Sequence, residues 1–400
     1  IFDEVPICRA DTRVEGVICR VLCPRRLSLR TKMSTRVTAE SEYIPRIPQQ
    51  CEAQGTEMKI ATIQTAGFVR GGARDLTASV DVAPSGEVLS CSAYVGSISC
   101  AAVSSAECRC RGGITVCVLS KESGGGISEK VTKLEFDETV MLDGETQSGT
   151  SAAASGVITS AEVREDAAGA HIEVTYSLTV ECASRTEAAV TADAYNCNVP
   201  TAAEYGDAAY LSLISPISGS ISVSEGTGIK SGTDAEVIFA DAEVGDATYD
   251  NGRVRLEGRV TGSVLQRNAD SGAYEVQSFS LPWRFDAGAE HINAGVGGEI
   301  YFRGSANVVS VSCRTGGGDL EVDAEVSVSG FAMETCRERV LESLELLPND
   351  AEPCRRGIVV YYPDRDEGIW DVAKKFRVPT SAVASGENVT DGKLNRVVVI

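Results

Sequence analysis

Cysteine and histidine are the residues of this chain best suited to redox or metal chemistry. The chain has 14 Cys and 2 His among 400 residues, and none of its cysteines forms a Cys-x-x-Cys pair. Zinc sites of the common kinds are built from such pairs and from histidine, so the spacing predicts no metal site. Cys108 and Cys110 would point to the same face of a strand, where reduced cysteine packs as a small apolar residue. Disulfides within or between subunits are the alternative.

Catalytic motifs with a known mechanism are not found in the sequence. There is no Gly-x-Ser-x-Gly elbow, Walker loop or His-Glu-x-x-His pair. The glycine-rich stretch Glu122–Gly126 lacks the Lys-Ser/Thr that a phosphate loop requires, and a hairpin turn explains it better. His171 and His291 offer little for general-base chemistry near neutral pH. We therefore predict no enzyme, no catalytic residue and no cofactor.

A strongly acidic balance limits the kinds of partner. The formal net charge is −20 and the pI is near 4.6, which argues against nucleic acid, because neutralising phosphates needs a basic surface. Solubility explains the charge, and a basic partner or divalent cations are the sharper alternative. No stretch approaches the roughly 20 apolar residues of a membrane span. The chain begins with Ile1 and shows no signal peptide, so we expect its true N-terminus, with any secretion signal, to lie upstream.

The elements that must position these residues come from a stretch that the chain repeats. Two copies occupy Glu87–Leu119 and Glu236–Leu265. Both open with Glu-Val-(Leu/Ile) and continue with Ala-x-Val-Gly, and Gly112 or Gly258 then precedes alternating apolar residues. A damaged third copy surrounds Gly16. Internal repeats outrank any single motif in deciding architecture.

Each copy has a second half at nearly the same distance downstream. The three second halves are Arg70–Val82, Glu165–Val180 and Arg314–Val328, each a glycine-rich turn before an alternating strand. Apolar residues at every second position, such as Ile172 and Val174, have the period of a strand. The glycines between such runs predict hairpin loops, so each repeat is expected to be a β module of about 100–120 residues.

The predicted fold is mainly β, in tandem units that resemble β-sandwiches or barrels. We place an N-terminally truncated unit at residues 1–83, a second unit at 84–182, a sheet extension and linker at 183–234, and a third unit at 235–347. Thr335–Leu347 fits either a capped helix or a last strand, and the second unit favours the strand at the same place. The prolines Pro348 and Pro353 then mark a domain boundary.

Residues 355–400 change character and predict a small α+β domain. A strand at Ile358–Tyr362 is followed by a helix at Ile369–Phe376, which has apolar residues at core spacing. A second helix begins near Pro379, where proline fits the first turn. Arg396–Ile400 returns as a strand. The order is therefore strand, helix, helix, strand.

This tail resembles a LysM domain. The resemblance rests on Val360-Tyr361-Tyr362, on Asp366–Phe376, and on Val378 and Asn388, although Gly368 replaces the small hydroxyl residue of the family's usual turn. It implies a groove that binds N-acetylglucosamine chains or a protein. The residues of the two groove walls would be Asp366, Glu367, Gly368 and Ile369, and Ser385, Gly386, Glu387 and Asn388. Trp370 is expected to pack within the tail, as Trp283 packs in the third unit.

Repeats of this size followed by one LysM domain are similar to the clostridial SPOCS-domain proteins, including the SipL-type spore-coat assembly factors. Asp193-Ala194-Tyr195-Asn196 resembles the Asp-Ala-Tyr-Ser of that family. The resemblance implies a non-catalytic structural or assembly protein of the bacterial spore envelope. In it the repeats would form a scaffold, and the LysM domain would dock onto a spore-coat morphogenetic ATPase or onto cortex glycan.

The same resemblance implies a location in the mother-cell cytoplasm at the forespore surface, and later in the spore coat. An extracellular or cell-wall surface is expected instead if a signal preceded Ile1. Two alternatives stay open: a self-assembling filament subunit of the spore or cell surface, and a cell-wall protein anchored to peptidoglycan. Exposed sheet edges favour the filament, because they can template strand addition.

Overall fold

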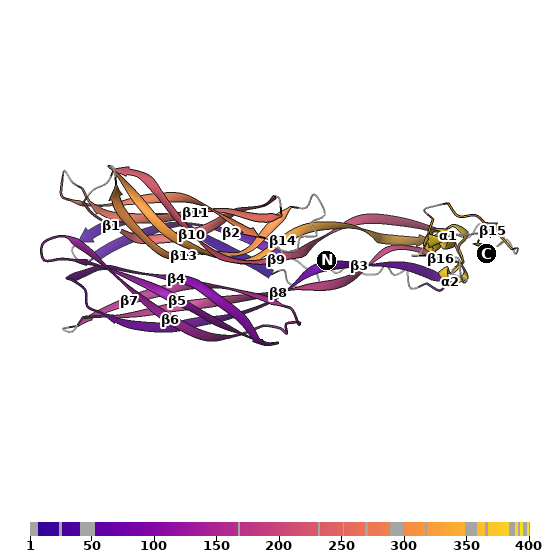
Figure 1. Ribbon diagram of the computed structural model, residues 1–400, viewed down its shortest axis with the longest axis horizontal. Coiled ribbons are helices and arrows are strands. Elements are labelled where there is room, and N and C mark those ends of the chain that lie inside the picture. Colours follow the sequence, from indigo (N-terminus) through magenta and orange to yellow (C-terminus); the bar gives the residue numbers. More distant parts are fainter. Residues whose placement is uncertain are drawn as a thin grey trace. The chain divides into compact units, whose positions relative to one another are not determined.

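The structure is a computed structural model of the 400-residue chain (Figure 1). It describes residues 7–23, 26–40, 53–166, 169–230, 233–250, 252–268, 271–288, 299–316, 318–348, 358–364, 367–383, 389–390, 393–394 and 398–399. The fold is mainly β, in several small antiparallel sheets with few helices, as the sequence predicts.

Six strands form a first repeat. They are β3 (Thr56–Val82), β4 (Glu87–Ser104), β5 (Glu107–Lys121), β6 (Ile127–Met141), β7 (Ser151–Asp166) and β8 (Gly169–Asn196). One sheet has the strand order β4-β5-β6, and the other has the order β3-β8-β7. Short hairpins join β4 to β5, β5 to β6 and β7 to β8, and these pairs are antiparallel.

Six further strands repeat this arrangement. They are β9 (Thr201–Lys230), β10 (Thr233–Asp250), β11 (Arg253–Arg267), β12 (Tyr274–Gly288), β13 (Ile300–Gly316) and β14 (Asp319–Leu346). Their sheets have the orders β10-β11-β12 and β13-β14-β9, which match the first repeat strand for strand. Figure 1 shows the strands of each repeat lying side by side.

Both sheets of a repeat share one hydrophobic core. In the first repeat, buried side chains from β3 to β8 form a single cluster that includes Ile114, Phe136 and Ile172. Strand β8 buries every second residue from Ala170 to Cys182, which confirms the alternation predicted there. Such alternation turns one face of a sheet to the core and the other outward. The two sheets of each repeat therefore pack face to face.

The sequence markers of the repeat coincide with β-bulges. Where Glu-Val-(Leu/Ile) occurs, the pairing register shifts within Val88–Ser90 of β4 and within Val237–Phe239 of β10. Where Ala-x-Val-Gly occurs, it shifts within Val95–Ile98 and within Val244–Ala247. A bulge inserts an extra residue and bends its strand. The repeated residues thus lie at the bulges of two equivalent strands, β4 in the first repeat and β10 in the second.

The marker glycines lie opposite aromatic side chains. Gly112 pairs with Phe136 across β5 and β6, and Gly258 pairs with Trp283 across β11 and β12. A Cβ on Gly258 would lie 2.4 Å from Cε2 of Trp283 and 2.1 Å from the carbonyl oxygen of Glu243. Only glycine leaves room for the indole to cover the backbone at this point. Trp283 is buried in the core of the second repeat, which is the packing that the sequence predicts.

Two predictions made from the repeat are wrong. Arg70–Val82 is not a turn followed by a strand but lies inside the continuous strand β3. Its Gly71 is needed for close approach instead, because a Cβ there would lie 2.1 Å from the carbonyl oxygen of Met141. Residues 183–234 were expected to be a sheet extension and a linker, and the structure has the end of β8 and the whole of β9 there, so the sheet extension is confirmed and the linker is not. The strand expected near Thr335 is confirmed, since β14 extends to Leu346.

The two repeats contact each other through polar and aromatic side chains. Arg303 of β13 forms an ion pair with Glu181 of β8 at 2.9 Å, and Arg70 of β3 lies 2.8 Å from the same carboxylate. The guanidinium of Arg303 also covers the ring of Phe68 at 4.2 Å. Only 6 % of the Arg303 side chain is exposed, and a buried charge is tolerated when it is paired in this way.

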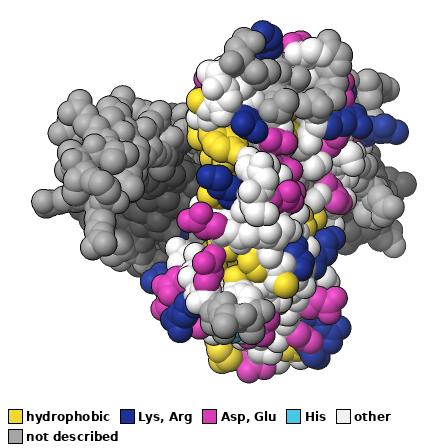
Figure 2. Space-filling view, turned by 90° about the vertical axis from the view of Figure 1, so that its left-hand side faces the viewer, with side chains coloured by type: hydrophobic (Ala, Val, Ile, Leu, Met, Phe, Trp, Pro, Cys, Tyr) yellow, Lys and Arg dark blue, Asp and Glu magenta, His cyan; other side chains and the backbone are white. Residues whose placement is uncertain are grey.

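Charged side chains of both signs are scattered over the surface. Figure 2 shows basic and acidic side chains interspersed on one face, with hydrophobic side chains between them. Several acidic groups are paired: Asp137 with Arg109 at 2.6 Å, and Asp286 with Arg255 at 2.9 Å. Mixed charge of this kind favours solubility, which is the simpler explanation of the net charge.

The chain divides into two compact units. One holds residues 61–189 and 206–340, and the other holds residues 1–60, 190–205 and 341–400. In the unit that holds residues 1–60, strands β1 (Ile7–Cys23) and β2 (Arg26–Glu40) form an antiparallel pair. The ends of β8, β9 and β14 belong to the same unit as the C-terminal residues.

The C-terminal module, residues 358–399, contains two helices and short strands in its described part. Helix α1 (Ile369–Phe376) confirms the predicted helix, and α2 (Thr380–Val383) follows it. The other elements are β15 (Val360–Tyr361), which pairs with β18 (Val398–Val399), and the hairpin of β16 (Val389–Thr390) and β17 (Lys393–Leu394). At the start of α1 the N–H of Gly368 donates to the carboxylate of Asp371 at 2.9 Å, and left-handed Arg377 ends the helix.

Candidate docking site of the C-terminal helix

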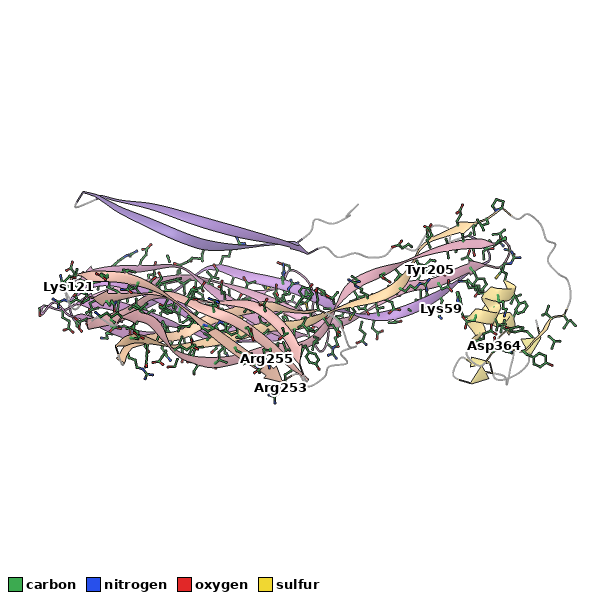
Figure 3. All side chains as sticks on the ribbon, turned by 90° about the horizontal axis from the view of Figure 1, so that it is seen from above. Lys59, Lys121, Tyr205, Arg253, Arg255 and Asp364 are labelled. Carbon is green, nitrogen blue, oxygen red and sulfur yellow. The ribbon has the colours of Figure 1, made fainter. Side chains whose placement is uncertain are left out.

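An extensive polar site in the unit that holds the C-terminal residues is built around Asp193, near the end of β8. Its carboxylate accepts hydrogen bonds from Trp370 Nε1 at 2.8 Å and from Tyr205 OH at 2.6 Å. The ammonium of Lys374 donates to both carboxylate oxygens, at 2.7 and 2.8 Å. We call Asp193, Tyr205, Trp370 and Lys374 the Asp193 site. It joins helix α1 to strands β8 and β9 (Figure 3 labels Tyr205 on β9).

Helix geometry explains why α1 supplies two donors to one carboxylate. Trp370 and Lys374 are four residues apart, so both side chains lie on the same face of the helix. The ammonium of Lys374 also lies 3.2 Å from the hydroxyl of Tyr205. The side chain of Asp193 is 18 % exposed and that of Lys374 is 36 % exposed. The charges are thus partly shielded from water, where hydrogen bonds to charged groups are strong.

The electrostatics of the Asp193 site favour the ionised pair. Burial opposes the charge of Asp193, but hydrogen bonds from Lys374, Tyr205 and Trp370 outweigh it and lower the pKa of this carboxyl. Burial likewise opposes the charge of Lys374, and its bonds to Asp193 and Tyr205 raise the pKa of the ammonium. The ion pair therefore contributes stability that is lost below the pKa of Asp193 and above that of Lys374.

An apolar cluster lies beside the polar site. The ring of Tyr195 meets the indole of Trp370 edge-on with a centroid distance of 5.0 Å. Its hydroxyl donates to the carbonyl oxygen of Val378 at 2.7 Å. Val372 and Val383 are buried in the same cluster. Strand β8 thus contacts the tail through Asp193 and Tyr195, which are two residues apart and lie on one face of the strand.

A second strand end adds to the contact. The hydroxyl of Thr380 in α2 donates to Glu57 in β3 at 3.0 Å. On the other face of β8, Ala194 packs with Leu341 and Leu344 of β14. The strand ends therefore form a small platform with its own apolar layer, on which α1 and α2 lie.

No family model, curated protein or solved structure matched the chain. Among the described residues, no group of three or more His, Cys, Asp and Glu side chains could hold a metal ion. None of the helices in the described ranges is long and apolar enough to cross a membrane.

Three of the residues predicted from the LysM resemblance to line a groove, Glu367, Gly368 and Ile369, lie within the described part of the chain. Glu367 accepts hydrogen bonds from Tyr361 OH at 2.6 Å and from the N–H of Asp364 at 3.1 Å, and Lys375 lies 3.3 Å away. These contacts, led by the Tyr361 bond, lower the pKa of Glu367. Gly368 caps α1, and Ile369 packs into the apolar cluster. The other predicted groove residues, Asp366, Ser385, Gly386, Glu387 and Asn388, lie outside the described residues.

Sequence reasoning found part of the Asp193 site and missed part. It selected the segment Asp193–Asn196 for its resemblance and predicted that Trp370 packs, but it gave neither residue a partner. Lys374 and Tyr205 were not selected at all. The spacing of Trp370 and Lys374 on one helix face could have indicated an acceptor opposite. Nothing in the sequence pairs that face with Asp193, because the two segments are far apart in the chain.

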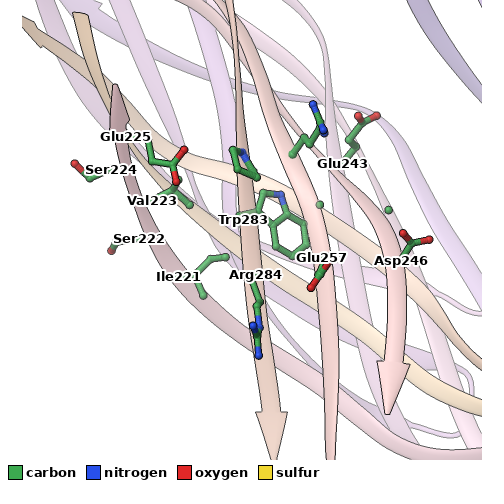
Figure 4. Close-up of a pocket in the computed structure, with 14 residues that line it drawn as sticks. Ile221, Ser222, Val223, Ser224, Glu225, Glu243, Asp246, Glu257, Trp283 and Arg284 are labelled. Carbon is green, nitrogen blue, oxygen red and sulfur yellow. The ribbon is translucent and has the colours of Figure 1, made fainter. Parts of the chain in front are cut away.

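A separate cavity of 760 Å³ lies in the second repeat. Figure 4 shows its acidic residues around Trp283; the carboxylates are Glu225, Glu243, Asp246 and Glu257, and Arg259 and Arg284 also line it. The indole of Trp283 is only 3 % exposed, so it forms part of the wall and offers no face for stacking. We assign no ligand to this cavity, because its lining mixes acidic and basic side chains and offers no aromatic face for stacking.

Proposed function

We propose that this chain is a non-catalytic structural or assembly protein of the bacterial spore envelope. The repeats would be a rigid scaffold, and the C-terminal module would be a LysM-type docking domain for a coat protein or for cortex glycan. The observation that carries the proposal is the Asp193 site. It ties the C-terminal helix to the strand ends through a bifurcated ion pair and an indole hydrogen bond.

Two features support a docking role for this module. The segment Asp193–Asn196 that carries the SPOCS resemblance is also the segment that holds α1. Strand ends that hold α1 in one orientation reduce the entropy lost when a partner binds to the module. The large apolar side chains of Ile358, Val360 and Tyr362 are 82 %, 55 % and 73 % exposed. Exposed apolar side chains close together are typical of surfaces that a protein partner covers.

A pull-down from sporulating cells tests the proposal. The 400-residue chain is compared with a chain lacking residues 355–400 and with the Tyr362→Ser variant of the 400-residue chain. We expect a coat protein to be captured by the full chain, to be lost on deletion, and to be weakened by the substitution. An unchanged set of partners in all three samples would refute the docking role. Binding of purified peptidoglycan that survives high salt would favour glycan as the partner instead.

A self-assembling filament subunit is the second candidate. Several edge strands expose large apolar side chains: Val131 and Met141 on β6, Val157 on β7, Val276 on β12 and Tyr301 on β13. An unpaired edge with such side chains can add a strand from another molecule. Light scattering and negative-stain microscopy, each with and without reductant, distinguish the two candidates. Long fibres would favour the filament, and a monomer or dimer would favour the docking protein.

A further inference from the structure

Four cysteines meet in the first repeat as two close pairs. Sγ of Cys108 lies 3.4 Å from Sγ of Cys182, and Sγ of Cys110 lies 3.5 Å from Sγ of Cys100. Cys108 and Cys110 are fully buried on the same face of β5, as the sequence predicts. Cys182 is 1 % exposed on β8, and Cys100 is half-buried on β4.

The backbone geometry of the Cys100–Cys110 pair suits a disulfide. These residues lie directly opposite each other in the antiparallel pairing of β4 and β5. Opposed residues in such a pair have Cα atoms about 4.5 or 5.5 Å apart, within the range of about 4.4–6.8 Å that disulfides occupy. Closing the bond would bring the two sulfurs together by about 1.5 Å, to a length of about 2.05 Å.

The Cys108–Cys182 pair links the two sheets of the repeat. β5 belongs to the β4-β5-β6 sheet and β8 to the β3-β8-β7 sheet. Cys108 is the second residue of β5, directly after the turn that follows β4. A strand end next to a turn can move toward the facing sheet more easily than a residue in the middle of a ladder. A bond here would therefore fasten the core across its two layers.

The second repeat shows that this core does not require cysteine for packing. The hairpins β7–β8 and β13–β14 have equivalent bulges at Ile158–Ser160 and Val308–Ser310. This register places Ala332 where β8 has Cys182, and Ala332 is also fully buried. The first fully buried residues of β11 are Val254 and Leu256, where β5 has its two cysteines. The equivalent positions of the second repeat thus pack without a thiol, so the paired sulfurs call for another explanation.

We propose that the first repeat is a disulfide-forming module that links Cys108 to Cys182 and Cys100 to Cys110 when a small-molecule disulfide such as oxidised glutathione is present. In each pair one thiolate attacks the glutathione disulfide and releases one glutathione thiol. The second thiolate then attacks the mixed disulfide and releases the other. Forming each protein disulfide removes two protons and two electrons from two thiols, and the glutathione disulfide accepts them as it is reduced to two glutathione thiols. Half-buried Cys100 gives the reagent access to the Cys100–Cys110 pair, and local opening of the fold gives access to the Cys108–Cys182 pair.

Peptide mapping tests this assignment on the 400-residue chain. The protein is incubated with oxidised or reduced glutathione, alkylated, and digested with proteases that cut after Glu107, Arg109 and Arg111. These cuts separate Cys100, Cys108 and Cys110 into different peptides. We expect the oxidised sample to contain the two links named above within one chain. Alkylated cysteines at all four positions, links between chains, or links to other cysteines would overturn the proposal, and absence of one link would overturn that pair.

A thermal measurement provides an independent readout. The inter-sheet link closes a loop of more than 70 residues, so oxidation should raise the Tm by on the order of 10 °C. Cys182→Ala has the residue that the second repeat places there, and should lose most of this oxidation-dependent rise. The control Cys117→Ala removes another buried cysteine of β5 and should keep it. Comparing oxidised with reduced Tm within each variant cancels the packing cost, and an equal rise in both variants would contradict the inter-sheet link.

Discussion

At the scale of the residue, Asp193 shows how one carboxylate organises a contact between distant segments. It lies on β8, while its donors come from β9 and α1. Water could satisfy the same carboxylate in an open chain, so its value lies in the simultaneous pairing of Lys374, Trp370 and Tyr205. Removing the charge would leave three donors facing a weaker acceptor.

The substitution Asp193→Asn tests this role. We expect it to weaken the contact of α1 by about 2 kcal/mol, because hydrogen bonds to charged groups contribute about 1.5–3 kcal/mol and Lys374 can regain water. Acrylamide quenching of tryptophan fluorescence gives the readout, since Trp283 is buried and Trp370 is only partly buried. Quenching should increase in the variant. The control Glu187→Gln changes an exposed acid of the same strand, and similar quenching in both variants would refute the role of Asp193.

Glu236 is a residue whose charge works against the fold. Burial, followed by repulsion from Glu129 and Asp234, raises its pKa to about 7. The folded state therefore keeps a proton that the unfolded state loses above its ordinary pKa of about 4.3. Stability from this group is complete below that value and is lost as the pH rises toward 7.

We expect Glu236→Gln to stabilise the chain at pH 8 and to change little at pH 4. The gain at pH 8 should be about 1–2 kcal/mol, because the group is partly exposed and solvent screens the effect. Urea unfolding of the variant and of the unmodified chain at both pH values gives the comparison. Equal midpoints at pH 8 would show that Glu236 is not held away from its ordinary pKa.

At the scale of the element, bulges and glycines shape the strands of each repeat. The residues that recur in the sequence are those at the bulges of β4 and β10, and the glycines that leave room for an aromatic ring over β5 and β11. Alternating core positions can be filled by many apolar residues, so they leave a weaker trace in the sequence. This explains why the repeat was visible although most of its core residues differ.

The substitution Gly258→Ala should destabilise the second repeat by about 2–4 kcal/mol. Its Cβ would lie 2.1 Å from a backbone oxygen, which cannot move without disturbing the sheet. Gly124→Ala is the matched control, since no atom lies within 4 Å of the added methyl group. Denaturant midpoints of the two variants give the measurement. A loss in Gly258→Ala no larger than in the control would contradict the close packing of Trp283.

The elements also show what sequence reasoning could reach. The helix at Ile369–Phe376 was predictable because its apolar spacing and flanking glycine and proline are local signals. The course of β3 was not, since Gly71 and Gly72 resemble a turn in sequence and only the neighbouring β6 end explains Gly71. Strand β9 was taken in part for a linker because it is rich in alanine, serine and glycine.

At the scale of the whole molecule, the division into repeats followed from the sequence only in part. Two copies of the marker stretch correspond to β4–β5 and β10–β11, but each structural repeat also needs a preceding long strand, β3 or β9. These strands pair with β8 and β14, which come last in their repeats. Pairing between the first and the last strand of a repeat leaves no periodic pattern in the sequence, because it depends on how the strands are ordered in the sheet.

A charge exchange at the Asp193 site tests most directly whether this carboxylate holds the C-terminal helix. Hydrogen exchange of the α1 amides would be measured in the unmodified chain, in Asp193→Lys, in Lys374→Asp and in the double variant. We expect protection to fall in each single variant, where like charges face each other, and to recover partly in the double variant, where the ion pair is reversed. Equal protection of α1 in all four proteins would contradict this expectation, because the C-terminal helix would then be held without Asp193.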